Sequence, residues 1–471
     1  MKKEDIYLKN DRLMKKKFLL LITAFISLYT GAQLPRLQVS NDHHHLVSSD
    51  GKPFFWMGDT GWELFHKLNK EDATFYFRKR SEQGFNVIQA VVLAELDGLH
   101  TPNAYGNLPF TNDDINKPDE KYFQYIDSLI DIAASYNLYI AMLPTWGDKI
   151  FKDAWGRGPE IFNPVNAYQY GKWIGNRYKD KTNIIWIIGG DRDPRPGTTD
   201  ADTWRSLARG VEVGMGGSQK ALMTFHCQPK GTGSSAQWFH DDNWLDMNML
   251  QTGHCRDTPV WESVGTDYSR IPVKPVLNGE CIYEEMPVCF NSKELGYASP
   301  YDVRKAAYLS VFAGACGHTY GCGPVIFFGD IGSNLFANLH GWREALDFPA
   351  AKEMKYLRNL MESRPLLDLA PDQNMLMSEG SCPSQHIQAI RGKDFAFVYS
   401  SYGDPILIRP NSISGGEIRA TWYDPRTGKS TVIGRFSNGQ EMAFTPPLPV
   451  ASPVPSQRED WVLVLEDDSL R

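Results

Sequence analysis

Two carboxylates stand out because each closely follows an apolar run long enough to be a buried strand. Asp191 follows residues 183–188, and Glu280 follows residues 274–278. If these runs are the fourth and seventh strands of a parallel barrel, both side chains lie at its carboxyl end, on opposite sides of the mouth. One group could then protonate a glycosidic oxygen while the other attacks the anomeric carbon or activates water, which is the chemistry of glycoside hydrolysis.

Other acidic residues compete for these two roles. Asp193 is the rival proton donor, Glu284 is the rival of Glu280, and Glu95, which follows the second apolar run, is a third candidate. Because Glu284 lies four residues beyond Glu280, we expect it past the end of the strand, in a salt bridge at the rim of the barrel.

The residues around Asp191 allow a catalytic and a structural interpretation. Gly189 and Gly190 place no side-chain bulk beside it, which is consistent with close approach of a substrate. Alternatively, Asp191 caps a helix or pairs with Arg192 or Arg195.

The ends of the other apolar runs carry aromatic and hydrogen-bonding side chains of the types that bind sugars. Indole rings could stack on sugar faces, and imidazole, amide and carboxylate groups could bind hydroxyls. A single strand-end residue is more often structural, so the prediction rests on their joint occurrence. The predicted stacking residues are Trp62, Trp146 and Trp155, and the other predicted substrate-binding residues are Asp59, Glu95, His226, Gln251, His254 and Tyr320.

The sequence gives no support for metal or cofactor chemistry. It contains no HExxH motif and no CxxC pair, and no lysine follows an apolar run in a position to form a Schiff base. We therefore expect a reaction without a cofactor or a metal. The histidine run at 43–45 is a weak metal candidate and is more typical of a polar strand or loop.

Eight short apolar runs alternate with longer amphipathic segments between residues 54 and 360, which predicts an α/β fold with a (β/α)8 barrel. The amphipathic segments at 119–136 and 342–361 predict helices, and Asn163-Pro164 and Ser299-Pro300 predict two helix starts. An open doubly wound sheet is the rival fold, but no glycine-rich nucleotide-binding turn follows the first run. The predicted strands are 54–58, 85–93, 138–143, 183–188, 221–225, 245–250, 274–278 and 317–320.

The pattern of apolar residues changes after about residue 364. Short alternating runs at 395–399, 406–408, 419–423 and 461–465 are separated by turn signals such as Asn438-Gly439. This pattern is typical of a small β-sandwich. We therefore predict a barrel domain over 33–363 and a β-sandwich domain over 364–471.

The first 32 residues resemble a secretory signal peptide. Three lysines at 15–17 precede an apolar run at 18–29, and Thr30-Gly31-Ala32 provides small residues for cleavage. Translation could begin at Met14, because the residues before it are polar. An uncleaved membrane anchor is the alternative, but the run is short for a bilayer span. We expect export to the periplasm or the exterior of a Gram-negative bacterium.

The composition excludes several classes of protein. With 42% hydrophobic and 22% charged residues, the chain of 471 residues is neither disordered nor fibrous. Its net charge of −7 gives no electrostatic basis for binding nucleic acid. We expect an oligosaccharide or polysaccharide as the partner, no stable membrane insertion, and a monomer. Seven cysteines, an odd number, leave at least one outside any intramolecular disulfide.

Four segments together resemble the apiosidase-like glycoside hydrolases of family 140. They are residues 54–64 (FFWMGDTGWEL), 84–88 (GFNVI), 185–191 (IWIIGGD) and 274–280 (KPVLNGE). The tail resembles the small β-sandwich domain that accompanies this family and carries a collagen-binding label.

The resemblance implies a (β/α)8 barrel with the acid/base on strand four and the nucleophile on strand seven, here Asp191 and Glu280. It also implies a retaining mechanism and cleavage of apiosyl linkages in side chains of the pectin rhamnogalacturonan II. The wider clan of retaining barrels has Asn-Glu where this sequence has Gly190-Asp191. The alternatives are a glycosidase that acts on another glycan, and a glycan- or matrix-binding protein without catalysis.

Overall fold

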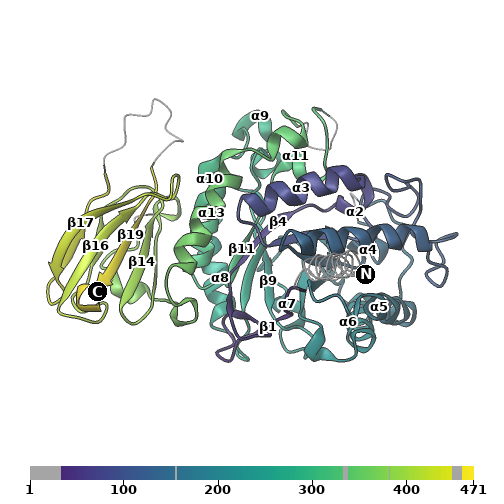
Figure 1. The fold of residues 1–471 in the computed structure, drawn as a ribbon, viewed down its shortest axis with the longest axis horizontal. Coiled ribbons are helices and arrows are strands. Elements are labelled where there is room, and N and C mark those ends of the chain that lie inside the picture. Colours follow the sequence, from purple (N-terminus) through teal and green to yellow (C-terminus); the bar gives the residue numbers. More distant parts are fainter. Residues whose placement is uncertain (1–32, 154–155, 333–337, 381, 448–458, 471) are drawn as a thin grey trace, which may run out of the picture.

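The computed structural model describes residues 33–153, 156–332, 338–380, 382–447 and 459–470. Eight parallel strands form one sheet in the order β8-β7-β6-β5-β4-β11-β10-β9, helices lie outside it, and an antiparallel domain follows (Figure 1). The predicted barrel and C-terminal β domain are confirmed, and every predicted barrel strand overlaps an observed one. The barrel strands are β4 (Trp56–Thr60), β5 (Val87–Val91), β6 (Tyr139–Leu143), β7 (Ile184–Gly189), β8 (Met223–His226), β9 (Asn248–Gln251), β10 (Val276–Glu280) and β11 (Gly317–Tyr320).

The strands at the two ends of this order, β8 and β9, meet through the residues around their starts. The backbone N–H of Asp246 donates to the carbonyl oxygen of Met223 at 3.0 Å. The hydroxyl of Thr224 donates to the carbonyl oxygen of Met247 at 2.8 Å. These contacts bring the sheet nearly to closure, as expected for a barrel of eight tilted strands.

A small antiparallel sheet, which the sequence analysis missed, covers the amino end of the barrel. The predicted first strand at 54–58 begins too early, because Phe54 pairs with this sheet and the barrel strand starts at Trp56. Leu37 and Leu46 pack in the same buried cluster as Trp56, so the sheet plugs this end of the barrel. Its strands are β1 (Leu37–Val39), β2 (Leu46–Ser48) and β3 (Pro53–Phe54).

The predicted helix starts are confirmed by their caps. The side chains of Asp119, Asn163 and Ser299 each accept hydrogen bonds from backbone N–H groups of the following first turn, which would otherwise lack partners. The helices are α2 (Leu64–Lys67), α3 (Lys70–Glu82), α4 (Glu120–Ser135), α5 (Pro164–Tyr178), α6 (Asp200–Met215), α7 (Ala236–Phe239), α8 (Val260–Tyr268), α9 (Ser292–Leu295), α10 (Pro300–Phe312), α11 (Gly323–Ile326), α12 (Trp342–Ala345) and α13 (Pro349–Glu362).

The predicted continuous helix over 342–361 is wrong. The structure divides it into α12 and α13, with Phe348 in an extended conformation between them. Pro349 explains the break, because proline cannot donate a backbone hydrogen bond and disfavours a helical conformation in the residue before it.

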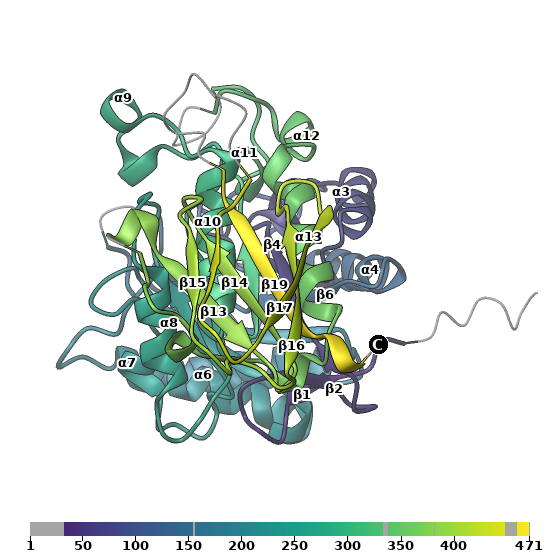
Figure 2. The ribbon, with the colours of Figure 1, turned by 90° about the vertical axis from the view of Figure 1, so that its left-hand side faces the viewer.

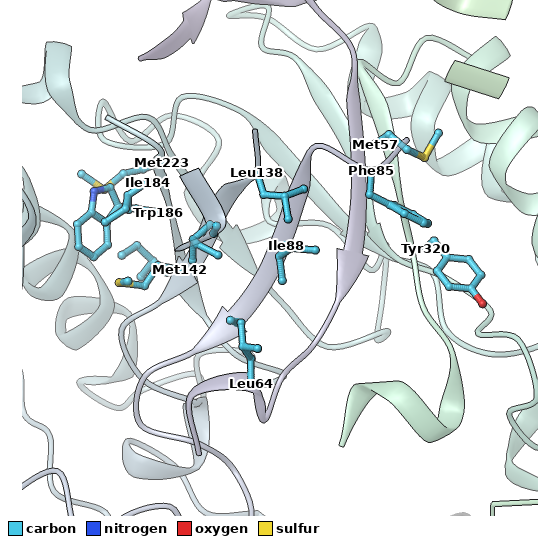
Figure 3. Close-up of a cluster of buried hydrophobic side chains, with 14 of the residues drawn as sticks. Met57, Leu64, Phe85, Ile88, Leu138, Met142, Ile184, Trp186, Met223 and Tyr320 are labelled. Atoms are coloured by element: carbon cyan, nitrogen blue, oxygen red, sulfur yellow. The ribbon is translucent and has the colours of Figure 1, made fainter. Parts of the chain in front are cut away.

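Two buried layers lie on the two sides of the barrel wall. Side chains that point outward from successive strands, including Met57, Ile88, Met142 and Trp186, pack against the helices (Figure 3). Side chains that point inward form a separate cluster inside the barrel. Strand residues alternate between these layers, and this alternation decides which strand-end residues can reach the mouth.

The C-terminal domain consists of a six-stranded antiparallel sheet in the order β12-β13-β14-β19-β16-β17 and a two-stranded sheet, β15-β18. Figure 2 shows this domain in front of the barrel. The strands are β12 (Ala370–Pro371), β13 (Ile387–Arg391), β14 (Phe395–Ser400), β15 (Ile406–Ile408), β16 (Glu417–Tyr423), β17 (Ser430–Ser437), β18 (Met442–Phe444) and β19 (Trp461–Asp467).

The C-terminal domain packs against α10 and α13 of the barrel (Figure 1). Arg304 of α10 donates to both carboxylate oxygens of Asp460, at 2.7 and 2.6 Å, and this ion pair is almost fully buried. The rings of Tyr308 and Tyr399 stack across the same boundary with centroids 4.9 Å apart. A buried ion pair inside an aromatic contact indicates a fixed interface rather than a flexible linkage.

Two sequence predictions fall outside the described residues: the signal peptide at 1–32 and the stacking residue Trp155. None of the helices in the described part of the chain is long and apolar enough to cross a membrane.

Candidate active site

Glu280 reaches the mouth of the barrel through a bulge in β10. Val276 and Asn278 point outward, toward the helices, so strict alternation would also turn Glu280 outward. However, Asn278 pairs with Leu250 while Glu280 pairs with Gln251, so Gly279 is an extra residue on the β10 side. The bulge reverses the alternation and directs the carboxylate inward, a common use of bulges beside active sites.

Two imidazoles hold the carboxylate of Glu280. His226 Nε2 lies 2.8 Å from Oε2, and His254 Nε2 lies 3.3 Å from Oε1. Burial alone would raise the pKa of Glu280, but the hydrogen bonds from the two histidines outweigh it and lower the pKa to about 2. Glu280 is therefore ionised throughout the neutral and mildly acidic range, as a carboxylate nucleophile must be.

His226 also connects Glu280 to Asp191. The backbone N–H of Asp191 donates to His226 Nδ1 at 3.1 Å. Because Nδ1 accepts this hydrogen bond, the single ring proton resides on Nε2 and is donated to Glu280. The arrangement fixes the tautomer of His226 and ties the end of β7 to the nucleophile candidate at the end of β10.

Asp191 sits in a turn that places three consecutive residues at positive φ. The φ angles are +96° at Gly189, +138° at Gly190 and +52° at Asp191. A Cβ on Gly190 would lie only 2.9 Å from the backbone nitrogen of Gly147. The interpretation that the two glycines make room for substrate is therefore corrected: they are needed for the turn and for close backbone packing.

Arg192 and Gln251 lie next to the carboxylate of Asp191. Arg192 Nη1 lies 3.5 Å from Oδ2 and also donates to the backbone carbonyl of Asp191 at 2.6 Å. The side-chain amide of Gln251 forms hydrogen bonds with its neighbours when its nitrogen, and not its oxygen, faces Asp191 Oδ1, at 3.2 Å. Arg195, the other proposed partner, pairs instead with Asp200. The side chain of Asp191 is still 16% exposed, so it remains accessible at the mouth.

Glu95 lies near Asp191 and is only 7% exposed. Burial, followed by the negative charge of Asp191, raises the pKa of Glu95 well above its usual range. Glu95 can thus remain protonated, which avoids placing a second negative charge beside Asp191.

Trp62 and Trp146 form the aromatic floor around His226. The Trp62 ring is centred 5.2 Å from that of Trp146 and 5.3 Å from that of His226. Each indole is only 3% exposed. The structure therefore brings seven of the predicted residues together at the carboxyl end of the barrel, with Glu95 beside them: Asp191, Glu280, His226, His254, Gln251, Trp62 and Trp146.

The structure does not bring Asp59 and Tyr320 to this site, which corrects their prediction as sugar-binding residues. Asp59 points outward from β4 and is fully buried, where its Oδ2 accepts a hydrogen bond from Arg80 Nε at 2.7 Å. Tyr320 points outward from β11 and packs against Phe85 (Figure 3). Their positions near strand ends predicted side chains at the mouth of the barrel. The alternation of side chains along each strand instead places them between the barrel strands and the helices.

The rival carboxylates are also placed by the structure. Glu284 is not in a salt bridge at the rim, as expected, but is 2% exposed and accepts a hydrogen bond from the Tyr320 hydroxyl at 2.6 Å. Burial raises the pKa of Glu284 to about 7. Asp193 is partly buried, and its Oδ1 accepts a hydrogen bond from the backbone N–H of Gln228 at 3.0 Å.

Sequence reasoning missed two supporting features of the site. Lys149 and Asp148 form a fully buried ion pair at 2.7 Å, and Lys149 also donates to the backbone carbonyl of Ala94, next to Glu95. A disulfide between Cys255 and Cys289 joins the loops that follow β9 and β10. The residue after His254 is a cysteine, but spacing alone could not identify its partner.

The described residues contain no group of three or more histidine, cysteine or acidic side chains arranged to hold a metal ion. The histidines at 43–45 lie in the turn between β1 and β2, where His44 stacks on Tyr268 with centroids 4.0 Å apart. These contacts belong to the plugged amino end of the barrel, away from Glu280.

Residues 40–368, more than half of the chain, match the family model described as "Apiosidase-like, catalytic domain". The chain belongs to the apiosidase-like family. Asp191 and Glu280 both lie inside the matched region. Residues 370–466 match the model described as "Putative collagen-binding domain of a collagenase". No curated protein matches the sequence.

Two solved structures resemble this apiosidase-like protein over nearly its whole length. A glycoside hydrolase family 5 protein from Bacteroides vulgatus ATCC 8482 is 32% identical, with a TM-score of 0.83, and the match covers 92% of this chain and 93% of that one. A second protein, described as a glycoside hydrolase, is 34% identical, with a TM-score of 0.83 and coverage of 92% and 97%. This apiosidase-like protein is therefore a glycosidase built on a TIM barrel.

Proposed function

We propose that this glycosidase is exported and cleaves apiosyl linkages in side chains of rhamnogalacturonan II with retention of configuration. Glu280 would be the nucleophile and Asp191 the acid/base. The observation that carries the proposal is the state of Glu280: two imidazoles hold a buried carboxylate, with its pKa lowered to about 2, at the carboxyl end of a barrel strand.

In the first step, Asp191 donates its proton to the glycosidic oxygen while Glu280 attacks the anomeric carbon. The bond to the leaving group breaks, and a glycosyl ester forms on Glu280. The Nδ1 of His226 accepts the backbone N–H of Asp191, so its Nε2–H is directed at the carboxylate of Glu280. His226 therefore orients the carboxylate.

In the second step, Asp191 takes a proton from water, and the resulting nucleophile attacks the anomeric carbon and releases Glu280. The sugar keeps its configuration after two inversions. Glu95 supports this cycle, because a proton held on Glu95 permits Asp191 to be either charged or neutral without a second charge beside it.

The substrate and the location rest on different parts of the chain. The apiosidase-like match over residues 40–368 supports an apiose-containing substrate. The family that the sequence resembles acts on such linkages in the side chains of the pectin rhamnogalacturonan II. The basic and apolar segment before residue 33 supports export.

The test is the release of sugar from rhamnogalacturonan II oligosaccharides by the purified protein. Mass spectrometry should identify apiose among the products of the wild type, and early NMR spectra should show retention at the anomeric carbon. Release of a different sugar would contradict the proposed substrate. A product with inverted configuration would contradict the role of Glu280 as nucleophile and would assign it as a general base. Sequencing of the mature N-terminus from a periplasmic or extracellular fraction tests export, which an intact cytoplasmic N-terminus would contradict.

A further inference from the structure

Phe290 is a large apolar side chain that is exposed next to the residues holding the nucleophile candidate. It lies in the loop after β10 and is 62% exposed. Its ring makes an edge-on contact with His254, with centroids 5.4 Å apart, and His254 Nε2 lies 3.3 Å from Glu280 Oε1. One imidazole therefore separates this exposed ring from the carboxylate of Glu280.

The backbone holds Phe290 in an unfavourable conformation. Cys289 and Phe290 have φ angles of +50° and +58°. These angles lie in the left-handed region, which residues other than glycine, asparagine and aspartate rarely adopt. Strain of this kind persists only where surrounding contacts impose it, and it concentrates at functional sites.

Two connections impose this conformation. The disulfide between Cys255 and Cys289 ties the loop to the residue after His254. The backbone N–H of Cys289 donates to the carbonyl oxygen of His254 at 2.9 Å. Phe290 is thus fixed with respect to His254 and, through it, to Glu280.

Phe290 differs from an ordinary exposed apolar residue. A single exposed apolar residue needs no special reason, and Val213, 45% exposed on α6, is such a case. Phe290 differs because its exposure is combined with a strained backbone, a covalent staple and contact with a residue of the site.

We propose that Phe290 is the stacking platform of a sugar-binding subsite, where its ring covers the apolar C–H face of a substrate sugar next to the bond that is cleaved. Aromatic faces bind C–H groups favourably, and a rigid ring loses little conformational freedom on binding. The proposal rests on the proposed function in one respect: the roles of Glu280 and Asp191 define where the cleaved bond lies.

Steady-state kinetics of Phe290→Ala, Phe290→Tyr and the matched control Val213→Ala test the subsite. The substrate is the rhamnogalacturonan II oligosaccharide mixture if the wild type cleaves it, and otherwise the plant cell-wall glycan in a panel that it does cleave. Phe290→Ala should raise KM by roughly 3- to 10-fold with little change in kcat. Phe290→Tyr and Val213→Ala should stay within about 2-fold of the wild type.

The split between kcat and KM separates stacking from an indirect role. If Phe290→Ala lowers kcat or shifts its pH profile while KM is unchanged, Phe290 only supports His254, and the subsite proposal is overturned. An unchanged KM together with an unchanged kcat also overturns it. Failure to cleave rhamnogalacturonan II contradicts the proposed substrate, whereas the response of KM to Phe290→Ala is read on whichever glycan is cleaved.

A double-mutant cycle with the disulfide provides a second test. Replacing Cys255 and Cys289 by serine should raise KM in the same direction, since the platform is no longer held. Adding Phe290→Ala to that variant should then have a smaller effect than it has in the wild type. Additive effects would contradict the proposal that the disulfide positions the ring. Circular dichroism and thermal unfolding establish that the serine variant is folded, and the single Phe290 variants remain informative if it is not.

Discussion

The barrel contains two clusters of buried carboxylates at neighbouring strand ends, and they have different chemistry. The inner cluster, formed by Glu280, Asp191, His226 and His254, points into the mouth. The outer cluster, formed by Asp59, Arg80, Tyr76, Glu284 and Tyr320, lies between the barrel wall and the helices. The outer cluster pairs its charges internally, while the inner cluster keeps one ionised carboxylate and one accessible carboxyl group.

The direction of each side chain, and not its place at a strand end, separates the two clusters. Asp59 is the next-to-last residue of β4 and Glu280 is the last residue of β10, and both are almost completely buried. Asp59 follows the alternation of its strand and points outward, whereas the bulge at Gly279 turns Glu280 inward. One extra residue therefore decides whether a strand-end carboxylate becomes part of the structure or part of the site.

The largest effect is expected from Asp191→Asn, which removes the acid/base. Asparagine keeps the size of the side chain and tolerates the left-handed backbone at this position. kcat/KM on the cleaved glycan should fall by about 100- to 10,000-fold, the usual contribution of acid–base catalysis. Asp193→Asn is the matched control and should lower kcat/KM by less than about 5-fold. If the control falls further than Asp191→Asn, the roles of the two residues are exchanged.

The next effect is on stability and belongs to the outer cluster. Arg80→Ala leaves the buried carboxylate of Asp59 without its ion-pair partner, which should lower the free energy of unfolding by about 3–5 kcal/mol. The activity of the fraction that remains folded should be unchanged. Urea unfolding and activity per folded molecule provide the comparison, and a loss of kcat without a loss of stability would assign the outer cluster to catalysis.

The sequence was sufficient to predict the barrel and the position of Asp191 and Glu280 at its carboxyl end, because the eight apolar runs and the helix caps are local signals. It could not show which alternate residues of each run point inward, so Asp59 and Tyr320 were assigned to the wrong side of the wall. An isolated glycine in a strand is a signal for a bulge, so Gly279 could have been recognised. Pro349 is likewise a local signal for the break between α12 and α13.

Other features depend on contacts between distant segments. The turn at 189–191 is required by its packing on Gly147, more than 40 residues earlier in the sequence. The disulfide between Cys255 and Cys289 and the left-handed residues at 289–290 likewise arise only in the folded loops. No periodicity in the sequence encodes these relations.

A smaller effect is expected on the way stability depends on pH, and it arises from the buried carboxyl group of Glu284. The pKa of Glu284 is raised to about 7 in the folded protein from an ordinary value of 4.5, so the native state binds this proton more tightly than the unfolded state does. Wild-type stability should therefore fall as pH rises from about 4.5 to 7, by on the order of 2 kcal/mol. Glu284→Gln should flatten this decline in urea unfolding at pH 5 and pH 8, and an equal decline in both proteins would contradict the assignment.

The smallest effect is expected from His226→Ala. Loss of one hydrogen bond to the nucleophile should lower kcat by about 10-fold. It should also raise the pKa of Glu280, because a donor to the charged form is removed. The acidic limb of the pH profile of kcat/KM should then move to higher pH. An unchanged acidic limb would show that His226 does not control the ionisation of Glu280.

The most direct test of the account compares Glu280→Gln with Glu284→Gln, which make the same chemical change four residues apart in the inner and outer clusters. kcat/KM is measured for each variant on rhamnogalacturonan II oligosaccharides, or on the glycan that the wild type cleaves. Glu280→Gln should lower it by at least about 100-fold, and Glu284→Gln should stay within about 3-fold of the wild type. A Glu280→Gln protein that keeps a tenth or more of the wild-type activity, or an equal loss in both variants, would contradict the assignment of Glu280 as the nucleophile.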